Sequence, residues 1–182
     1  MRKPRARTSR VLLVIAEPRL AAADRTWIET IRRRHDPNHR VVPPHFTLVF
    51  HAAMRQEAAV AAHVRRIAAR FRRFACRLRC ALTYPDSLSG QTYVSLMPDE
   101  GFAALVRLHD RLYTGPLKRQ LRLDIPFTPH VTLARFATPA PAKRLADRIN
   151  ARDFAVRADV GAIDLVAYDG AAVTPLARIA LR

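Results

Sequence analysis

One five-residue pattern occurs twice in this chain and constrains its fold more than any other feature. Residues 44–48 read Pro-His-Phe-Thr-Leu, and residues 129–133 read Pro-His-Val-Thr-Leu, so that each half of the chain holds one copy. Alternating polar and apolar residues predict a half-buried strand in each copy. Two matched strands, one in each half, predict a pseudo-symmetric molecule in which both contribute to one site.

The strand geometry predicts which side chains of the pattern lie together. Alternate residues of a strand share a face, so His45 and Thr47 point the same way, as do His130 and Thr132. Each motif strand thus presents an imidazole and a hydroxyl on one surface and apolar side chains on the other. If the two polar surfaces meet across a cleft, two imidazoles and two hydroxyls face one pocket.

The rest of the chain repeats a common order of elements around each motif, namely strand, helix, motif strand, helix and strand. We expect helices between Pro18 and Pro37 and at 56–73, 99–113 and 142–151. We expect strands at 11–16, 45–50, 74–82, 91–97, 130–136 and 173–181, and a β-rich stretch at 154–168. This order predicts an α+β fold with two lobes, one from each half. Two antiparallel sheets should line a central cleft, with the helices outside.

Length and hydropathy predict one domain. We expect residues 11–182 to form a single two-lobed domain and residues 1–10 to form a basic flexible tail. No apolar run approaches the ~18 residues of a membrane span. The apolar run after the basic start is about six residues, short of a signal-peptide core of ~7–15. We therefore expect a cytoplasmic protein that does not bind a membrane.

The two cysteines give no sign of a disulfide. Cys76 and Cys80 lie on one predicted strand, where a spacing of four residues separates them by roughly 13 Å, beyond the ~7 Å limit for a bridge. We interpret both as small buried apolar residues.

The formal net charge of +17 suggests a polyanionic partner such as RNA. Nearly all the basic residues are Arg, however, and a biased genomic base composition would produce the same skew. We interpret the run Arg32-Arg33-Arg34 as the solvated end of a helix, favourable near the negative pole of the helix dipole.

A pair of facing histidines suits acid–base catalysis at a phosphorus atom. An imidazole has a pKa near ~6.5, so one ring can take a proton from water while the other gives one to the departing oxygen. Neutral Thr hydroxyls can donate hydrogen bonds to the phosphate. A metal site would normally need a third protein ligand, often a carboxylate, and the motifs contain none. We therefore expect neither a metal nor a cofactor.

The paired motifs, with Pro before each His, and the segment 129–136 (PHVTLARF) resemble the 2H phosphoesterase superfamily. The similarity is greatest to its branch of 2′-5′ RNA ligase-like RNA 2′,3′-cyclic phosphodiesterases. This resemblance implies metal-independent hydrolysis of a cyclic phosphate at an RNA end to a 2′-phosphate, with weak 2′-5′ ligation as a side activity. It implies that His45 is the proton donor to the leaving 3′ oxygen and that His130 is the base for water. Thr47 and Thr132 would hold the phosphate.

Two parts of this assignment depend on residues outside the motif cores. Arg135 has the parity of the predicted core residues of its strand, so it should face away from the histidines unless the strand ends or twists there. If it does face them, it is a candidate for phosphate or RNA binding. Tyr93, Phe127 and Phe136 are candidates for stacking on a base.

Alternative functions are hydrolysis of 2′,5′-linked oligonucleotides or small cyclic nucleotides, and non-catalytic RNA binding. Intact His and Thr at all four motif positions favour an enzyme, and a complete catalytic set in one chain favours a monomer.

Overall fold

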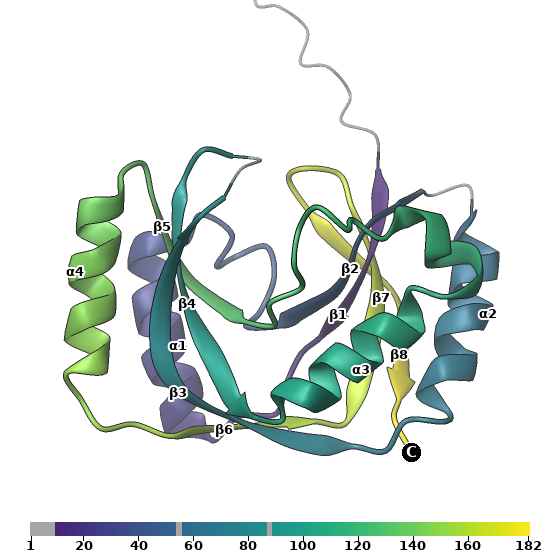
Figure 1. The fold of residues 1–182 in the computed structure, drawn as a ribbon, viewed down its shortest axis with the longest axis horizontal. Helices are drawn as coiled ribbons and strands as arrows, with labels where there is room; N and C mark the ends of the chain where they lie inside the picture. The colour runs from purple at the N-terminus through teal and green to yellow at the C-terminus, as the bar shows by residue number, and fades with distance from the viewer. Residues whose placement is uncertain (1–9, 54–55, 87–88) are drawn as a thin grey trace, which may run out of the picture.

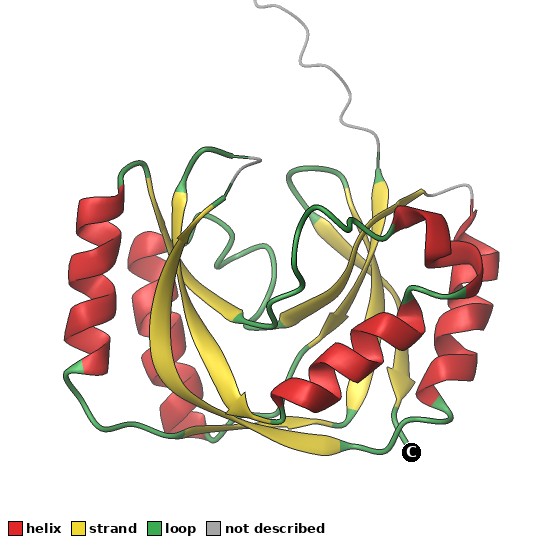
Figure 2. Ribbon diagram, viewed as in Figure 1, coloured by secondary structure: helices red, strands yellow, loops and turns green. Residues whose placement is uncertain are grey.

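The computed structural model describes residues 10–53, 56–86 and 89–182, and its strands form two four-stranded antiparallel sheets (Figures 1 and 2). The first sheet has the order β2 (Phe46–Ala53), β1 (Val11–Ala16), β7 (Ala162–Tyr168), β8 (Val173–Ala180). The second has the order β5 (Val131–Phe136), β4 (Thr92–Glu100), β3 (Phe74–Pro85), β6 (Val156–Val160). The two motif strands, β2 and β5, are therefore edge strands of different sheets.

The α-helices of the described residues lie on the outer sides of the sheets, as Figure 1 shows. They are α1 (Ala22–His35), α2 (Glu57–Ala68), α3 (Phe102–Leu112) and α4 (Pro139–Asn150), and a short 3₁₀ helix, η2, covers Gly115–Gln120. None of the helices in this part of the chain is long and apolar enough to cross a bilayer. The predicted α+β class, with antiparallel sheets and helices outside, is confirmed.

The prediction that each half of the chain forms its own lobe is wrong. β7 and β8 come from the second half but complete the first sheet, while β3 comes from the first half but lies in the second sheet. The helices cross over too, because α1 contacts β5 and α3 contacts β2. Each motif strand is therefore covered by a helix from the opposite half, which ties the halves into one body.

The predicted boundaries differ from the observed ones mainly where a glycine or proline intervenes. α1 ends at His35 because the residue before Pro37 is restricted to extended conformations. α3 begins only after Gly101, which has φ of 80°, so residues 99 and 100 extend β4 rather than starting the helix. Of the predicted basic tail, residues 1–9 lie outside the described residues.

β1 is buried on both faces, which explains its continuous apolar sequence. Leu12, Val14 and Ala16 join the main core under the helices. Leu13 and Ile15 belong to a second, smaller cluster on the opposite face. Ile15 pairs across the sheet with Thr47, so this second cluster lies on the motif side of the first sheet. The side of this sheet that carries the site is therefore largely apolar.

Candidate active site

The two motif histidines stand at corresponding positions, directly before the edge strands β2 and β5. His45 Nδ1 lies 2.8 Å from the carbonyl oxygen of Pro43, and His130 Nδ1 lies 2.7 Å from that of Thr128. A carbonyl oxygen can only accept a hydrogen bond, so Nδ1 carries the hydrogen in both rings. Each Nε2 is then the nitrogen that can take up or release a proton. The two histidines are also held in the same way, because each Nδ1 donates to the carbonyl oxygen of the residue two positions earlier.

The surroundings lower the pKa of both histidines. Burial lowers the pKa of His45 to about 4, with smaller contributions in the same direction from the charges of Arg32 and His130. Burial also lowers the pKa of His130, against the effect of its hydrogen bond to Thr128. Near pH 7 both rings are therefore neutral in the free protein. The influence of His130 on His45 also shows that the two rings lie within electrostatic reach of each other.

Tyr84 on β3 contacts the second histidine and was missed by the sequence reasoning. Its hydroxyl lies 2.8 Å from His130 Nε2, and because Nδ1 carries the ring hydrogen, the phenol donates to Nε2. Burial raises the pKa of Tyr84 to about 12, so the phenol stays protonated. The hydroxyl of Ser95 lies 3.4 Å from the same phenol oxygen. A tyrosine two strands away from the motif strand carries no sequence signal of this contact.

Arg135 faces the same side of β5 as Thr132, against the simple parity of the strand. Thr132 pairs with Ser95 and Ala134 pairs with Val94, so Leu133 is an extra residue at a β-bulge. The bulge shifts the alternation by one residue, which buries both Leu133 and Ala134 and turns Arg135 outward from the core. The sequence predicted that Arg135 would face the histidines only if the strand ended or twisted there, and this bulge is such a distortion.

The first motif has a bulge at the same place. Thr47 pairs with Ile15 and Val49 pairs with Val14, so Leu48 is the extra residue. Phe50 therefore occupies the position that Arg135 has in the second motif, and its side chain is 43% exposed. The site is pseudo-symmetric in backbone but has a phenylalanine on one side and an arginine on the other.

Arg135 joins a column of stacked side chains on the second sheet. Its guanidinium carbon lies 5.0 Å from the ring centroid of Tyr93, whose ring stacks on that of Tyr84 at 5.6 Å and 17°. Cation–π and aromatic contacts of this kind favour a fixed geometry. The column runs from His130 to the end of β5.

The helix end before the first motif is not simply solvated, as the sequence had suggested. Arg32 is 2% exposed, and its guanidinium donates to Asp36 at 2.9 Å and to the carbonyl of Val42 at 2.8 Å. Asp36 also lies 3.7 Å from Arg135. Arg32 therefore fixes the segment that leads to His45, and its partner Asp36 contacts the second motif strand. Only Arg33 and Arg34 are exposed as predicted.

The other candidate residues divide between the site and its surroundings. Tyr93 belongs to the column beside His130, Phe127 stacks on His109 at 3.8 Å, and Phe136 packs against His35 at 5.3 Å. Both cysteines are free thiols. Within the described residues, no three His, Cys, Asp or Glu side chains gather closely enough to hold a metal ion.

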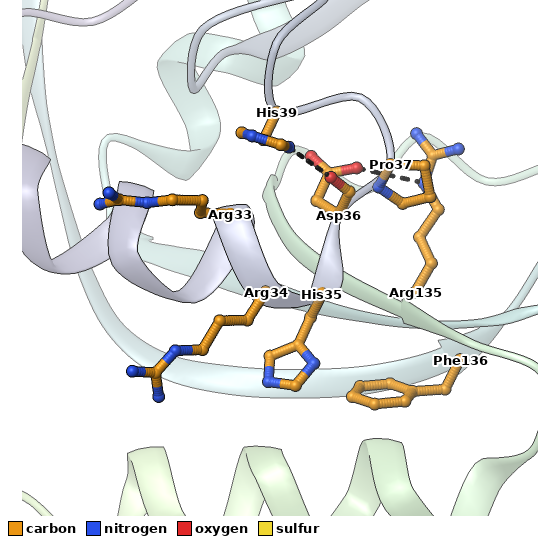
Figure 3. Close-up of a pocket in the computed structure, with 8 residues that line it drawn as sticks. All are labelled: Arg33, Arg34, His35, Asp36, Pro37, His39, Arg135 and Phe136. Carbon is orange, nitrogen blue, oxygen red and sulfur yellow. Dashed lines mark hydrogen bonds and ion pairs between the residues drawn. The ribbon is translucent and has the colours of Figure 1, made fainter.

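A hollow of about 460 Å³ borders this site at the end of β5 (Figure 3). It is lined by the end of α1, the loop after it and the last residues of β5, and Arg135 belongs both to this lining and to the column beside His130. Neither histidine of the motifs lines it.

Comparison with known proteins finds a family model, curated relatives and solved structures that match this chain. The model of the family described as the 2′-5′ RNA ligase superfamily matches residues 18–172. A protein of Bacillus licheniformis, provisionally named a phosphoesterase, is 29% identical over 106 residues, which are 57% of this chain and 59% of that protein. A similarly named protein of Geobacillus kaustophilus is 31% identical over 112 residues, 60% of this chain and 61% of that protein. The chain thus spans about three fifths of the length of the curated relatives it matches.

Solved structures with the same fold cover nearly the whole chain. The structure of E. coli LigT complexed with 3′-AMP has a TM-score of 0.63 and 24% identity, and the match covers 97% of this chain and 99% of that one. TT0787 of Thermus thermophilus has a TM-score of 0.64 and 22% identity, with 94% and 98% coverage. These likenesses show the fold.

Proposed function

The chain belongs to the 2′-5′ RNA ligase superfamily of 2H phosphoesterases, and from this membership we propose that it hydrolyses 2′,3′-cyclic phosphodiesters at RNA ends to 2′-phosphates. The observation that carries the proposal is the repeated His-x-Thr unit with identical anchoring of both rings. The complex of E. coli LigT with 3′-AMP supports a nucleotide ligand for this fold.

In the proposed reaction, His130 is the base and His45 is the acid. Nε2 of His130 takes a proton from water, the water oxygen attacks phosphorus, and the bond from phosphorus to the 3′ oxygen breaks. His45 gives its Nε2 proton to that 3′ oxygen, leaving a 2′-phosphate. Thr47 and Thr132 donate hydrogen bonds to the phosphate oxygens. Proton transfers of this kind contribute ~10²–10⁴-fold each.

The lowered pKa values of both histidines are compatible with His130 as the base and with His45 as an acid that gains its proton when substrate binds. Burial lowers the pKa of His130 and keeps it neutral in the free protein, so its Nε2 can accept a proton from water once the Tyr84 phenol gives up its hydrogen bond to that nitrogen. His45, with a pKa of about 4, is also neutral there. A bound phosphodiester anion favours the charged form of a neighbouring imidazole, so substrate binding raises the pKa of His45 and supplies the acid.

The polyanionic substrate class is supported by charge near the site. Arg135 lies on the same side of β5 as Thr132 and is held by Tyr93. The proposed partner is therefore RNA or an oligonucleotide with a cyclic phosphate end, bound by a monomer. A weak reverse reaction would join RNA ends through a 2′-5′ linkage.

The test is hydrolysis of an oligonucleotide that ends in a 2′,3′-cyclic phosphate, in the presence of EDTA, with the phosphate position of the product read by phosphorus NMR. We expect a 2′-phosphate. A 3′-phosphate product would contradict the assigned leaving group. Cleavage of 2′,5′-linked or small cyclic nucleotides alone would move the protein to another substrate class. RNA binding with no turnover would indicate a non-catalytic module.

A further inference from the structure

The hollow beside the site combines cationic and aromatic side chains. Arg33 and Arg34 extend from the end of α1 on one side of Asp36, while Arg135 comes from β5 on the other (Figure 3). His35 and Phe136, whose ring centroids are 5.3 Å apart, also line it, together with Pro37 and His39. Guanidinium groups beside aromatic rings are the combination that binds single-stranded nucleic acid. It is a wide, open hollow of about 460 Å³ rather than an enclosed cavity, which suits an extended strand.

The charge of the hollow is positive after its internal pairs are taken into account. Asp36 is its acidic lining residue, and the buried guanidinium of Arg32 pairs with it at 2.9 Å. Asp36 lies farther from Arg135, at 3.7 Å, and the Nε of Arg135 is buried with no hydrogen-bond partner. Arg33, Arg34 and Arg135 therefore contribute positive charge that the pair does not cancel. Burial, together with the charges of Arg148 and Arg34, lowers the pKa of His35, so this ring stays neutral near pH 7.

A chain of side-chain contacts links the hollow to His130. Thr132 and Arg135 lie on one side of β5, and Tyr93 and Tyr84 form a stack that joins Arg135 to His130. On the far side, a second hollow of about 340 Å³ shares Arg34 and His35 and continues between α1 and α4 past Arg148 and Arg152. Arginine side chains thus line both hollows, and Arg34 lines the two together.

We propose that this hollow is a binding subsite for the RNA strand upstream of the cyclic phosphate, with Arg33, Arg34 and Arg135 contacting internucleotide phosphates. The inference rests on the proposed function, because it takes the cyclic phosphate to lie at the histidines. It makes the preferred substrate an oligonucleotide rather than a mononucleotide. His35 and Phe136 offer ring surfaces to an upstream base.

The test compares two substrates in three proteins. The substrates are a 2′,3′-cyclic mononucleotide, which has no upstream phosphate, and a short RNA with the same cyclic end. The proteins are the wild type, the double variant Arg33→Ala with Arg34→Ala, and the control Arg72→Ala with Arg73→Ala. The control removes the same charge from two exposed arginines that line neither hollow.

We expect the Arg33/Arg34 variant to lose roughly five- to thirtyfold in kcat/KM on the RNA, since exposed charge contacts are worth up to ~1 kcal/mol each. It should keep its rate on the mononucleotide. The slope of log kcat/KM against log salt should also become shallower by about 1.4 on the RNA, because each phosphate contact on a single strand contributes about 0.7. The Arg72/Arg73 control should keep more than half of the wild-type rate on both substrates.

Three results would overturn the subsite. They are an equal loss on both substrates, an equal loss in the control, and no change on the RNA. Direct binding of an RNA that ends in a 3′-hydroxyl, measured by fluorescence anisotropy, separates this inference from the proposed function. One result would refute the proposed hydrolysis but support the RNA subsite. It is the absence of turnover on both substrates together with weaker binding of this RNA by the Arg33/Arg34 variant than by the control. Equal RNA binding by both variants would refute the subsite whatever the activity.

Discussion

Replacing Asp36 by Ala should destabilise the protein through the buried guanidinium that it leaves behind. Arg32 is 2% exposed and donates to the Asp36 carboxylate from Nε at 3.1 Å and from Nη2 at 2.9 Å. Without that carboxylate, the guanidinium keeps the Val42 carbonyl at 2.8 Å and Glu29 at 3.2 Å. The backbone N–H of Asn38 also loses its acceptor, which lies 3.0 Å away.

The size of the effect follows from removing one partner of a buried ion pair. Such a change costs about 3–5 kcal/mol, because the remaining charge stays desolvated. In a domain of this size, 1 kcal/mol corresponds to ~2–4 °C in Tm, so the melting temperature should fall by roughly 6–20 °C. The double variant Arg32→Met with Asp36→Leu, which removes both charges, should lose less stability than Asp36→Ala alone.

The assay is urea unfolding followed by circular dichroism, with Asp124→Ala as control. Asp124 makes two hydrogen bonds to Arg122, but both side chains are exposed, so this control should leave the midpoint nearly unchanged. A loss below ~1 kcal/mol for Asp36→Ala would refute the reasoning. So would a double variant less stable than the single one.

Three further results are expected. Gly101→Ala should destabilise the fold by more than ~1 kcal/mol in urea unfolding, because Gly101 has φ of 80° and a Cβ there would lie 2.5 Å from the carbonyl oxygen of Ala75. Gly90→Ala is the control and should destabilise the fold less, because Gly90 has a similar φ but open space around it. The free energy of unfolding should fall by on the order of 2–3 kcal/mol as the pH drops from about 6.5 to about 4. In this range His45 is protonated in the unfolded chain but stays neutral in the folded protein, where burial lowers its pKa to about 4. A free energy of unfolding that does not change with pH in urea titrations would contradict this. Tyr84→Phe should raise the pKa of His130, because the phenol donates to Nε2 of the neutral ring and so favours the unprotonated form. The acidic limb of the kcat/KM profile should therefore shift to higher pH in Tyr84→Phe but not in Tyr93→Phe, and identical pH profiles of the two variants would exclude this role of the phenol.

The sequence predicted those elements whose periodicity is set by burial. The run 11–16 matches β1 residue for residue, because a strand buried on both faces has no polar interruption. The motif strands and most of the helices lie where their alternation or helical spacing placed them. Residues 169–172 join β7 to β8, and Gly170 in this turn has a positive φ of 91°.

The features that escaped prediction depend on contacts between segments distant in the chain. The bulge at Leu133 is defined by the register between β4 and β5, so strand parity alone misplaced Arg135. The burial of Arg32 requires the loop that carries Val42 to fold back over the helix end. The crossing of elements between the halves depends on which strands pair, and a repeated local order does not specify it.

The most direct test of the paired-histidine site is a double-mutant cycle on kcat/KM for the cyclic-phosphate RNA in EDTA. His45→Ala and His130→Ala should each lose ~10²–10⁴-fold, and because the two rings act in one step, the loss in the double variant should be far smaller than the product of the two single losses. RNA binding should survive in all three proteins. Losses that multiply in full, or a single variant that keeps wild-type turnover, would contradict a mechanism in which His45 and His130 work as one acid–base pair.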